Sequence, residues 1–482
     1  MVMKQLLPHQ IEDAEFLASK SFAGNFSGMG SGKTLTALQA IRLVIRATAP
    51  HRAKNPKEAL AKVVRSHLSG SSHKLRVIVV GPPISLNMWK EEALEFFPDS
   101  TAQIVRSGVV TLEDANFFIM SYQIATKRRD ELKELGAMVL ICDEAHALFK
   151  IKLGYTQQPV PSKRTKAILG AGGLCESVEF SWFLTGTPST RYSCDLYPFL
   201  VRADTEGLKK RAGSDGLSKF YLRYCITQKK KFSPHQRVPA TVVVGNRNLE
   251  ELNEWMFDGG LAVRHELADV WAQMPPLTIN HLQVQLDTDP ELRQMLRAME
   301  KQTMSQVQED IGRKEEHIST LRRKLGAAKV KHSVSEIIDR IEAGIKPILV
   351  GAWHTEVIWA LYDALNVKDH DVGVIDGSVS AGVRDLCVRD FNNGTLPVLI
   401  AQIGAAGVSL NMQGGSHIIV VEEDWSPALM DQFYARCHRL GQKKHVHVDI
   451  FESDTKLDKA VHRINVTKAR GHRAMMDQGD AA

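Results

Sequence analysis

Gly28-Met29-Gly30-Ser31-Gly32-Lys33-Thr34 is the stretch that decides the fold of this chain. In such a glycine-rich loop, the backbone N–H groups and the N-terminus of the following helix bind phosphate oxygens. Lys33 would reach the β- and γ-phosphates of a nucleotide, and the hydroxyl of Thr34 would ligate Mg²⁺. The form GxGK[ST] is complete, whereas the longer form GxxxxGK[ST] fails at its first position, which is Ser27. Because glycine-rich turns before helices are common, the loop alone is a moderate signal.

A second stretch, Ile141-Cys142-Asp143-Glu144-Ala145-His146, lies about 110 residues further on. It completes an apolar run that begins at Met138, so the two acids are expected at the carboxyl end of a buried strand, where α/β proteins bind ligands. Asp143 would ligate Mg²⁺, and Glu144 would activate water. An acidic pair at a strand end is common by itself. Combined with the phosphate loop, it predicts hydrolysis of ATP, with ATP and Mg²⁺ as cofactors.

Length and composition limit the class of protein. A chain of 482 residues fits two or three domains, and 44% hydrophobic with 24% charged residues is typical of a globular protein. No apolar run approaches the roughly 20 residues that span a bilayer, and residues 1–5 begin no signal-peptide pattern, so we expect an intracellular, cytoplasmic protein. The six cysteines form no CxxC pair, which predicts neither a disulfide framework nor a zinc site.

Two parts of the chain alternate short apolar strands with helices, which predicts two doubly wound α/β domains with parallel sheets. The first part reaches about residue 200, and the second begins near Lys346. The expected strands are Val77 to Val80, Phe117 to Met120, Met138 to Cys142 and Phe183-Leu184 in the first part, and Ile348 to Val350, Val372 to Ile375, Val398 to Ala401, Ile418 to Val421 and Val446 to Ile450 in the second.

The segment between these parts, residues 205–345, has a helical pattern. It predicts long amphipathic helices over Asn248 to Met274 and Asp289 to Leu325. A coiled protrusion packed on the rest of the protein is favoured over a partner site. Basic clusters occur between Arg46 and Arg76 and at Lys127-Arg128-Arg129, and they could either neutralise a phosphate backbone or form a solvated surface.

A third element of the second part is Arg436-Cys437-His438-Arg439-Leu440-Gly441-Gln442. We expect Arg436 and Arg439, at positions i and i+3, to project from one helical face. A guanidinium near the γ-phosphate could stabilise charge in the transition state.

Together these motifs resemble the Swi/Snf-type ATPases of helicase superfamily two, almost from end to end of the chain. The family's nucleotide loop usually reads DEMGLGKT, so Ser27 and Gly28 replace its two acids here. The most specific match is Trp425-Ser426-Pro427 followed by HRxGQ, which has few other contexts. Further matches are Leu7 to Gln10, Val79 to Pro82 with Trp89 to Glu92, Ser121-Tyr122, Leu184 to Pro188, Asp376 to Ser378, Arg389 to Asn392 and Ala405 to Asn411.

The resemblance implies a role for each matching position. Catalytic residues would be Lys33, Asp143, Glu144, Arg436 and Arg439, with Thr34 and Asp143 holding Mg²⁺. ATP would contact Gln10, Met29, Gly30, Ser31, Gly32, Lys33, Thr34 and Gln432, where Gln10 reads the adenine. Residues that couple nucleotide state to DNA grip would be His146, Thr185, Gly186 and Thr187. DNA would contact Ser121, Lys127, Arg128, Thr355, Gly404, Ala405 and Gly407.

The resemblance also implies two RecA-like lobes with helical protrusions between them. We expect an N-terminal lobe over residues 1–204, a helical protrusion over 205–280 and a helical insertion with linker over 281–345. A C-terminal lobe over 346–455 and a brace helix with a tail over 456–482 would follow.

The function implied is an ATP-driven translocase on double-stranded DNA. Residues 223–225, 248–252 and 264–276 are similar to annealing helicases that remodel stalled forks, although the family's double arginine is Arg264-His265 here. DNA is therefore the expected partner, and a bacterial or phage-infected cytoplasm the expected location (a nucleus if the source is eukaryotic). Alternatives are a DNA helicase that separates strands, an RNA helicase, a generic duplex translocase targeted by a partner protein, and a non-catalytic DNA-binding scaffold. The preferred DNA structure and the direction of travel stay open.

Overall fold

The computed structural model describes residues 6–47, 75–108, 111–149, 151–153, 159–189, 192–230, 239–265, 274–313, 315–368, 370–406, 410–439 and 441–476. The chain divides into two compact units. Unit 1 comprises residues 1–270 with 471–482, and unit 2 comprises residues 271–470. Within the part of the chain that the structure describes, no helix combines the length and the apolar character that crossing a membrane requires.

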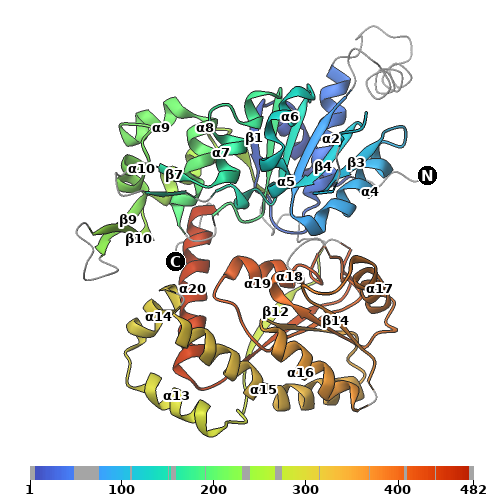
Figure 1. Ribbon diagram of the computed structural model, residues 1–482, viewed down its shortest axis with the longest axis vertical. Helices are drawn as coiled ribbons and strands as arrows, with labels where there is room; N and C mark the ends of the chain where they lie inside the picture. The colour runs from blue at the N-terminus through green and yellow to red at the C-terminus, as the bar shows by residue number, and fades with distance from the viewer. Residues whose placement is uncertain are drawn as a thin grey trace. The chain divides into compact units, whose positions relative to one another are not determined.

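Unit 1 is built on a parallel sheet of seven strands in the order β11-β1-β8-β5-β2-β4-β3 (Figure 1). The structure confirms the four strands expected here. It adds three that the sequence analysis missed, β1, β3 and β11, which are only two to four residues long. The strands are β1 (Phe22–Asn25), β2 (Val77–Gly81), β3 (Ala102–Val105), β4 (Phe117–Ser121), β5 (Val139–Asp143), β8 (Phe180–Leu184) and β11 (Ala262–Val263).

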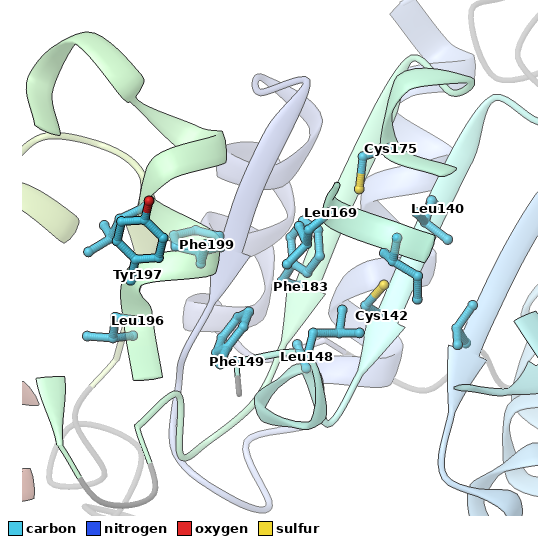
Figure 2. Close-up of a cluster of buried hydrophobic side chains, with 14 of the residues drawn as sticks. Leu140, Cys142, Leu148, Phe149, Leu169, Cys175, Phe183, Leu196, Tyr197 and Phe199 are labelled. Atoms are coloured by element: carbon cyan, nitrogen blue, oxygen red, sulfur yellow. The ribbon is translucent and has the colours of Figure 1, made fainter. Parts of the chain in front are cut away.

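Both faces of this sheet are buried, which explains why its strands are apolar throughout. Alternate residues of one strand enter different clusters, as in β5, where Ile141 packs on one face and Leu140 with Cys142 on the other. Figure 2 shows the second cluster, in which Phe149, Phe183 and Phe199 pack on one another. The first face is covered by α1 (Pro8–Ala18), α2 (Lys33–Ala47) and α4 (Leu86–Phe96), and the second by α5 (Tyr122–Lys127), α6 (Arg129–Glu134), α7 (Lys163–Leu169) and α8 (Tyr197–Ala203).

The segment of unit 1 that follows α8 contains short helices and a hairpin, and its last helix before β11 is short. It contains α9 (Thr205–Ala212), α10 (Leu217–Tyr224), the antiparallel hairpin of β9 (Cys225–Lys230) and β10 (Ala240–Asn246), and α11 (Leu249–Met256). The predicted helix over Asn248 to Met274 is therefore wrong. The chain turns at Gly260, whose φ is +66°, and β11 then joins the sheet beside β1. Shorter elements are β6 (Ile151–Leu153), β7 (Pro159–Pro161) and the 3₁₀ turns Pro83–Ser85, Ala145–Ala147, Leu174–Glu176 and Ser193–Leu196.

Unit 2 holds a second parallel sheet, of six strands in the order β12-β17-β16-β13-β15-β14. All five expected strands are present, and they confirm the α/β prediction. The edge strand β12 was missed because it falls in the segment that we assigned to helices. The strands are β12 (Leu277–Gln283), β13 (Ile348–Ala352), β14 (Val372–Ile375), β15 (Val398–Gln402), β16 (His417–Val420) and β17 (Val446–Glu452).

The charged helical segment of unit 2 folds back on itself. The single helix predicted over Asp289 to Leu325 is wrong, because α13 ends at Glu300 and α14 begins at Met304. Thr303 precedes α14, and its N–H donates a hydrogen bond to the side chain of Gln306 in the first turn of that helix at 2.7 Å. This hydrogen bond caps the N-terminus of α14. The apolar stripes of these helices pack on each other and on α20. The helices of unit 2 are α13 (Pro290–Glu300), α14 (Met304–Arg313), α15 (Glu316–Glu342), α16 (Thr355–Asn366), α17 (Ala381–Asn392), α18 (Ile403–Ala406), α19 (Pro427–Tyr434) and α20 (Lys456–Met476), of which residues 471–476 fall in unit 1.

Candidate nucleotide-binding site

The phosphate loop connects β1 to α2 in unit 1, and its shape depends on glycine. Gly30 and Gly32 have φ values of 77° and 82°, a left-handed conformation that side chains disfavour. A Cβ on Gly32 would also lie 2.1 Å from Nε2 of Gln10. Lys33 begins α2, and its ammonium donates hydrogen bonds to the carbonyl oxygens of Ser27 and Gly28, both at 2.8 Å. The lysine is thus held inside the curve of the loop.

Gln10 joins the first helix to this loop. Its side-chain oxygen accepts a hydrogen bond from the Leu7 N–H at 2.9 Å, and its Nε2 donates to the Ser31 carbonyl at 3.0 Å. His9 Nε2 lies 3.0 Å from the same carbonyl oxygen. The Gln10 side chain is only 3% exposed. The residue expected to read adenine therefore sits directly against the loop expected to bind phosphates.

The acidic pair lies at the carboxyl end of β5. β5 pairs with β8, and β8 pairs with β1, the strand that leads into the phosphate loop. Asp143 accepts a hydrogen bond from the indole N–H of Trp89 at 2.9 Å and another from the Glu144 N–H at 3.0 Å. The Tyr122 hydroxyl donates to the Asp143 carbonyl at 2.7 Å. Glu144 has a left-handed backbone, with φ 49°. Sequence reasoning quoted Trp89 and Tyr122 as family matches but assigned neither a role.

Burial dominates the electrostatics of this pair. It raises the pKa of Asp143 to about 6, and the charge of Glu144 adds to the shift, while the hydrogen bond from Trp89 opposes it. Burial also lowers the pKa of Lys33, although the charges of Glu144 and Asp143 oppose that change. A divalent cation would favour the carboxylate form of Asp143, because it supplies the opposite charge that the buried site lacks.

The donor set fits a nucleotide and Mg²⁺. The carboxylate of Asp143 and the hydroxyl of Thr34 are hard oxygen ligands of the kind that Mg²⁺ prefers. The Ser31 and Thr187 hydroxyl oxygens are buried and have no hydrogen-bond partner among the described residues. Buried polar atoms are nearly always satisfied, so these two indicate that a polar ligand belongs here.

The four residues predicted to couple nucleotide state to DNA grip converge in unit 1. His146 Nδ1 lies 3.2 Å from the Thr185 hydroxyl and 3.3 Å from the Glu144 carboxylate. The Thr187 N–H donates to the Thr185 hydroxyl at 3.2 Å. A Cβ on Gly186 would lie 2.8 Å from Met29 Cγ, so this segment touches the phosphate loop itself. Glu144 and the phosphate loop are thereby linked through His146 and the segment that follows β8.

A buried polar network behind the loop was not found from the sequence. Asp13 Oδ2 accepts hydrogen bonds from the Asn25 amide at 2.8 Å and the Ser27 hydroxyl at 2.9 Å. Its other oxygen lies 2.9 Å from His265 Nε2, and the His265 N–H donates to the Ser27 hydroxyl at 3.1 Å. Ser27 and His265, two of the positions that depart from the family pattern, are thus partners in one network. It fixes the base of the loop.

The arginine motif of unit 2 is a turn, not a helix face. Helix α19 ends at Tyr434, so the prediction that Arg436 and Arg439 share a helical face is wrong. Arg436 is 8% exposed, and its Nε and Nη1 donate to the carbonyls of Gln432 at 3.0 Å and Leu410 at 3.4 Å. These hydrogen bonds, to a carbonyl within α19 and to one that precedes it in the chain, hold the turn in place of helical geometry.

Gln442 completes this turn. Its amide donates to the carbonyls of Gln413, Gly415 and Cys437 at 2.9 to 3.1 Å. Its oxygen accepts from the N–H groups of Lys443 and Lys444, each at 2.9 Å. The most specific motif in the sequence therefore stabilises the backbone that presents the two arginines.

The predicted DNA-contacting residues are scattered and differ in availability. Ser121 caps α5 by accepting from the Ile124 N–H at 3.4 Å, and Lys127 is exposed. Arg128 forms two hydrogen bonds to Glu131, which reduces its availability for phosphate. In unit 2, Thr355 begins α16 and Gly404 lies in α18, and both are exposed; the backbone of Ala405 is also in α18. Gly407 and the basic residues 48–74 lie outside the described residues.

A phosphate loop, a lysine and an acidic pair at the carboxyl edge of a parallel sheet define a nucleotide site of the P-loop class. A family model described as "SNF2-related domain" matches residues 9–332, and one described as "Helicase conserved C-terminal domain" matches residues 330–441. The chain therefore belongs to the SNF2-related family, the Swi/Snf-type ATPases of helicase superfamily two.

Individual relatives are distant. SWI/SNF-related matrix-associated actin-dependent regulator of chromatin subfamily A-like protein 1 is 23% identical in Xenopus tropicalis and 24% in Bos taurus, each match covering 77% of this chain and 37% of the relative. The chain thus spans just over a third of the length of these relatives. Helicase SWR1 of Debaryomyces hansenii is 28% identical over 26% of this chain and 8% of its own. The structure titled "Sulfolobus solfataricus SWI2/SNF2 ATPase core in complex with dsDNA" aligns with a TM-score of 0.40 and 17% identity, covering 99% of this chain and 98% of that one.

Proposed function

We propose that this chain is an ATP-driven translocase on double-stranded DNA that remodels branched DNA by fork reversal, branch migration or strand annealing. The observation that supports it best is the convergence of Lys33, Asp143 and Glu144 at one buried edge of the unit 1 sheet. We divide the chain into five proposed parts, at residues 1–204, 205–280, 281–345, 346–455 and 456–482. The expected location is the cytoplasm of a bacterial or phage-infected cell, or a eukaryotic nucleus.

The residues of unit 1 account for the chemistry. Lys33 would exchange its two carbonyl partners in the loop for phosphate oxygens, while Thr34 and Asp143 would hold Mg²⁺. Glu144 would orient the attacking water and take its proton. Mg²⁺, when bound, neutralises charge that develops on the phosphates. Arg436 and Arg439 would stabilise the same charge, and Gln432 would contact the nucleotide.

The DNA preference rests on the family and on the similarity of the middle segment to annealing helicases. Contacts would be mostly to phosphates, so affinity should fall steeply with salt and depend little on sequence. Closure on ATP and reopening after hydrolysis would drive movement along the backbone.

The test is the steady-state ATPase rate with no DNA, single strands, plain duplex, a fork and a four-way junction. Lys33→Ala and Glu144→Gln are the controls that should abolish hydrolysis. Stimulation by fork or junction well above plain duplex would support branch remodelling. Equal stimulation by every duplex would leave a generic translocase whose target a partner protein sets. Stimulation by single strands or RNA alone would refute the duplex proposal and favour a strand-separating helicase.

A further inference from the structure

Two histidines and a glutamate meet in unit 2, and none of them belongs to the nucleotide site. His281 lies on the edge strand β12, Glu452 ends the neighbouring strand β17, and His462 lies on α20. The Glu452 Oε1 atom is 2.8 Å from His281 Nδ1 and 3.3 Å from His462 Nδ1. The three possible ligand atoms all lie within 4.8 Å of one another.

The topology brings these side chains to one side of the sheet. In the parallel register, His281 pairs with Ile450 and Gln283 with Glu452, so Glu452 lies two residues along from the partner of His281. Side chains two residues apart in a strand point to the same face. The His281 and His462 rings stand edge to face, with centroids 4.5 Å apart. Both imidazoles therefore direct Nδ1 towards one carboxylate oxygen.

Two of the three separations are close to those of a small tetrahedral ion. With zinc–ligand bonds of about 2.0 to 2.1 Å, neighbouring ligand atoms in a tetrahedral site lie about 3.3 Å apart. The two separations from Glu452, 3.3 Å and 2.8 Å, need an adjustment of at most about half an ångström. The two histidine ligand atoms lie within 4.8 Å of each other and would approach by up to about 1.5 Å on binding an ion. The Glu452 carboxylate lies within 3.3 Å of both imidazoles and would supply negative charge to a bound cation.

We propose that His281, Glu452 and His462 form a three-ligand site for a divalent transition-metal ion of the zinc type. Imidazole nitrogens select Zn²⁺ and its neighbours over Mg²⁺, which prefers oxygen ligands. The side chains are 31%, 15% and 39% exposed, which leaves the fourth position to water. Because the ligands come from β12, β17 and α20, a bound ion would fasten the first half of α20 to the edge of the sheet. Cysteine spacing could not reveal such a site, since it contains no cysteine.

The experiment is equilibrium dialysis of the tag-free, metal-stripped chain against Zn²⁺ at about pH 8, where imidazole is neutral, with elemental analysis of bound metal. The variants are His281→Gln and His462→Gln, and the matched control is His445→Gln. His445 is another histidine of unit 2, stacked on His447 at 4.1 Å. We expect one saturable ion per chain, bound at least tenfold more weakly by both variants and equally by the control. Affinity unchanged in the variants, or no saturable binding by the wild-type chain, would overturn the proposal.

A second measurement needs no variant. X-ray absorption at the zinc edge of the loaded wild-type chain should show two imidazoles with oxygen as the remaining ligands. Sulfur among the ligands would assign the ion to cysteines and refute the site. The thermal unfolding temperature should also rise by about 4 °C with excess Zn²⁺ in the wild-type chain. The His281→Gln chain should show no such rise.

Discussion

At the scale of single residues, the carboxyl group of Asp143 is the most sensitive part of the candidate site. Burial and the neighbouring Glu144 disfavour its charged form, whereas ligation of Mg²⁺ requires that form. The Trp89 indole, the charge of Lys33 and the Glu144 N–H oppose this rise in the pKa of Asp143. The charge of this carboxylate would therefore depend on a bound cation.

The first prediction concerns pH. Since the pKa of Asp143 is raised to about 6, protonation should remove the Mg²⁺ ligand as pH falls through that value. We expect DNA-stimulated ATPase activity to decline near pH 6 at low Mg²⁺. High Mg²⁺ should move this decline to lower pH, because the cation stabilises the carboxylate. Rates measured between about pH 5 and 8 at two Mg²⁺ concentrations test this. A decline at the same pH in both series would contradict it.

The second prediction concerns Trp89→Phe, which removes one indole donor together with part of a buried ring. A hydrogen bond to a charged group contributes about 1.5 to 3 kcal/mol, and loss of a residue that orients a metal ligand costs roughly tenfold or more in affinity. We expect the half-saturating Mg²⁺ concentration to rise about tenfold. Trp182→Phe is the control, because its buried indole donates to the Lys20 carbonyl instead. An equal rise in both variants would show that the effect is structural.

At the scale of elements, the site depends on close contact between β8 and the phosphate loop. Thr185 continues β8 and donates its N–H to the Asn25 carbonyl at the end of β1 at 3.1 Å. Gly186 then packs against Met29 without room for a side chain. A movement of the loop on nucleotide binding would therefore displace Gly186 and, through it, Thr185 and His146.

The third prediction is that Gly186→Ala weakens nucleotide binding. Its Cβ would lie 2.8 Å from Met29 Cγ and 3.2 Å from the Met29 backbone nitrogen, so the loop must shift. Overpacking of this kind costs about 1 to 3 kcal/mol in stability. Carried entirely by the ATP-bound form of the loop, it would weaken affinity by up to roughly five- to 150-fold. Titration of a fluorescent ATP analogue measures the change. Gly382→Ala is the control, since a Cβ there meets nothing within 4 Å. Unchanged affinity in Gly186→Ala would exclude the coupling.

At the scale of the whole molecule, each unit has its own parallel sheet and its own set of motif residues. Unit 1 holds the phosphate loop and the acids, and unit 2 holds Gln432, Arg436 and Arg439. Hydrolysis on the proposed mechanism needs both sets. The hydrogen bonds of Arg436 also hold its turn, so its loss would affect stability as well as catalysis.

The fourth prediction separates these two effects. Arg436→Lys should lower DNA-stimulated ATPase by about three orders of magnitude or more, as loss of a transition-state arginine does. Arg322→Lys is the control, because Arg322 is buried in unit 2, donates to the Glu423 carbonyl at 2.8 Å and pairs with Asp424 at 3.4 Å. Both variants should unfold at lower temperature. Only Arg436→Lys should lose activity well below that temperature. Equal activity loss in both would assign Arg436 a structural role.

The sequence by itself determined the two α/β units and the contiguous parts of the nucleotide site. Phosphate binding needs neighbouring backbone N–H groups and a lysine at fixed spacing, so residues 28–34 are recognisable wherever they fold. Strands β2, β5 and β13 were also predictable from the sequence, because strands that are buried on both faces are apolar without interruption.

Only the tertiary structure decided which distant side chains complete the site. Trp89 reaches Asp143 across 54 residues, and His265 reaches Ser27 across 238. Helical periodicity predicted continuous helices where α11 and α13 in fact end early. Local spacing does not show where a turn leads the chain back to a sheet, as after α11, or to a neighbouring helix, as after α13. The metal-type cluster of His281, Glu452 and His462 likewise exists only through the pairing of β12 with β17. Tertiary packing determines which residues far apart in the chain form hydrogen bonds, and a local sequence pattern carries no information about it.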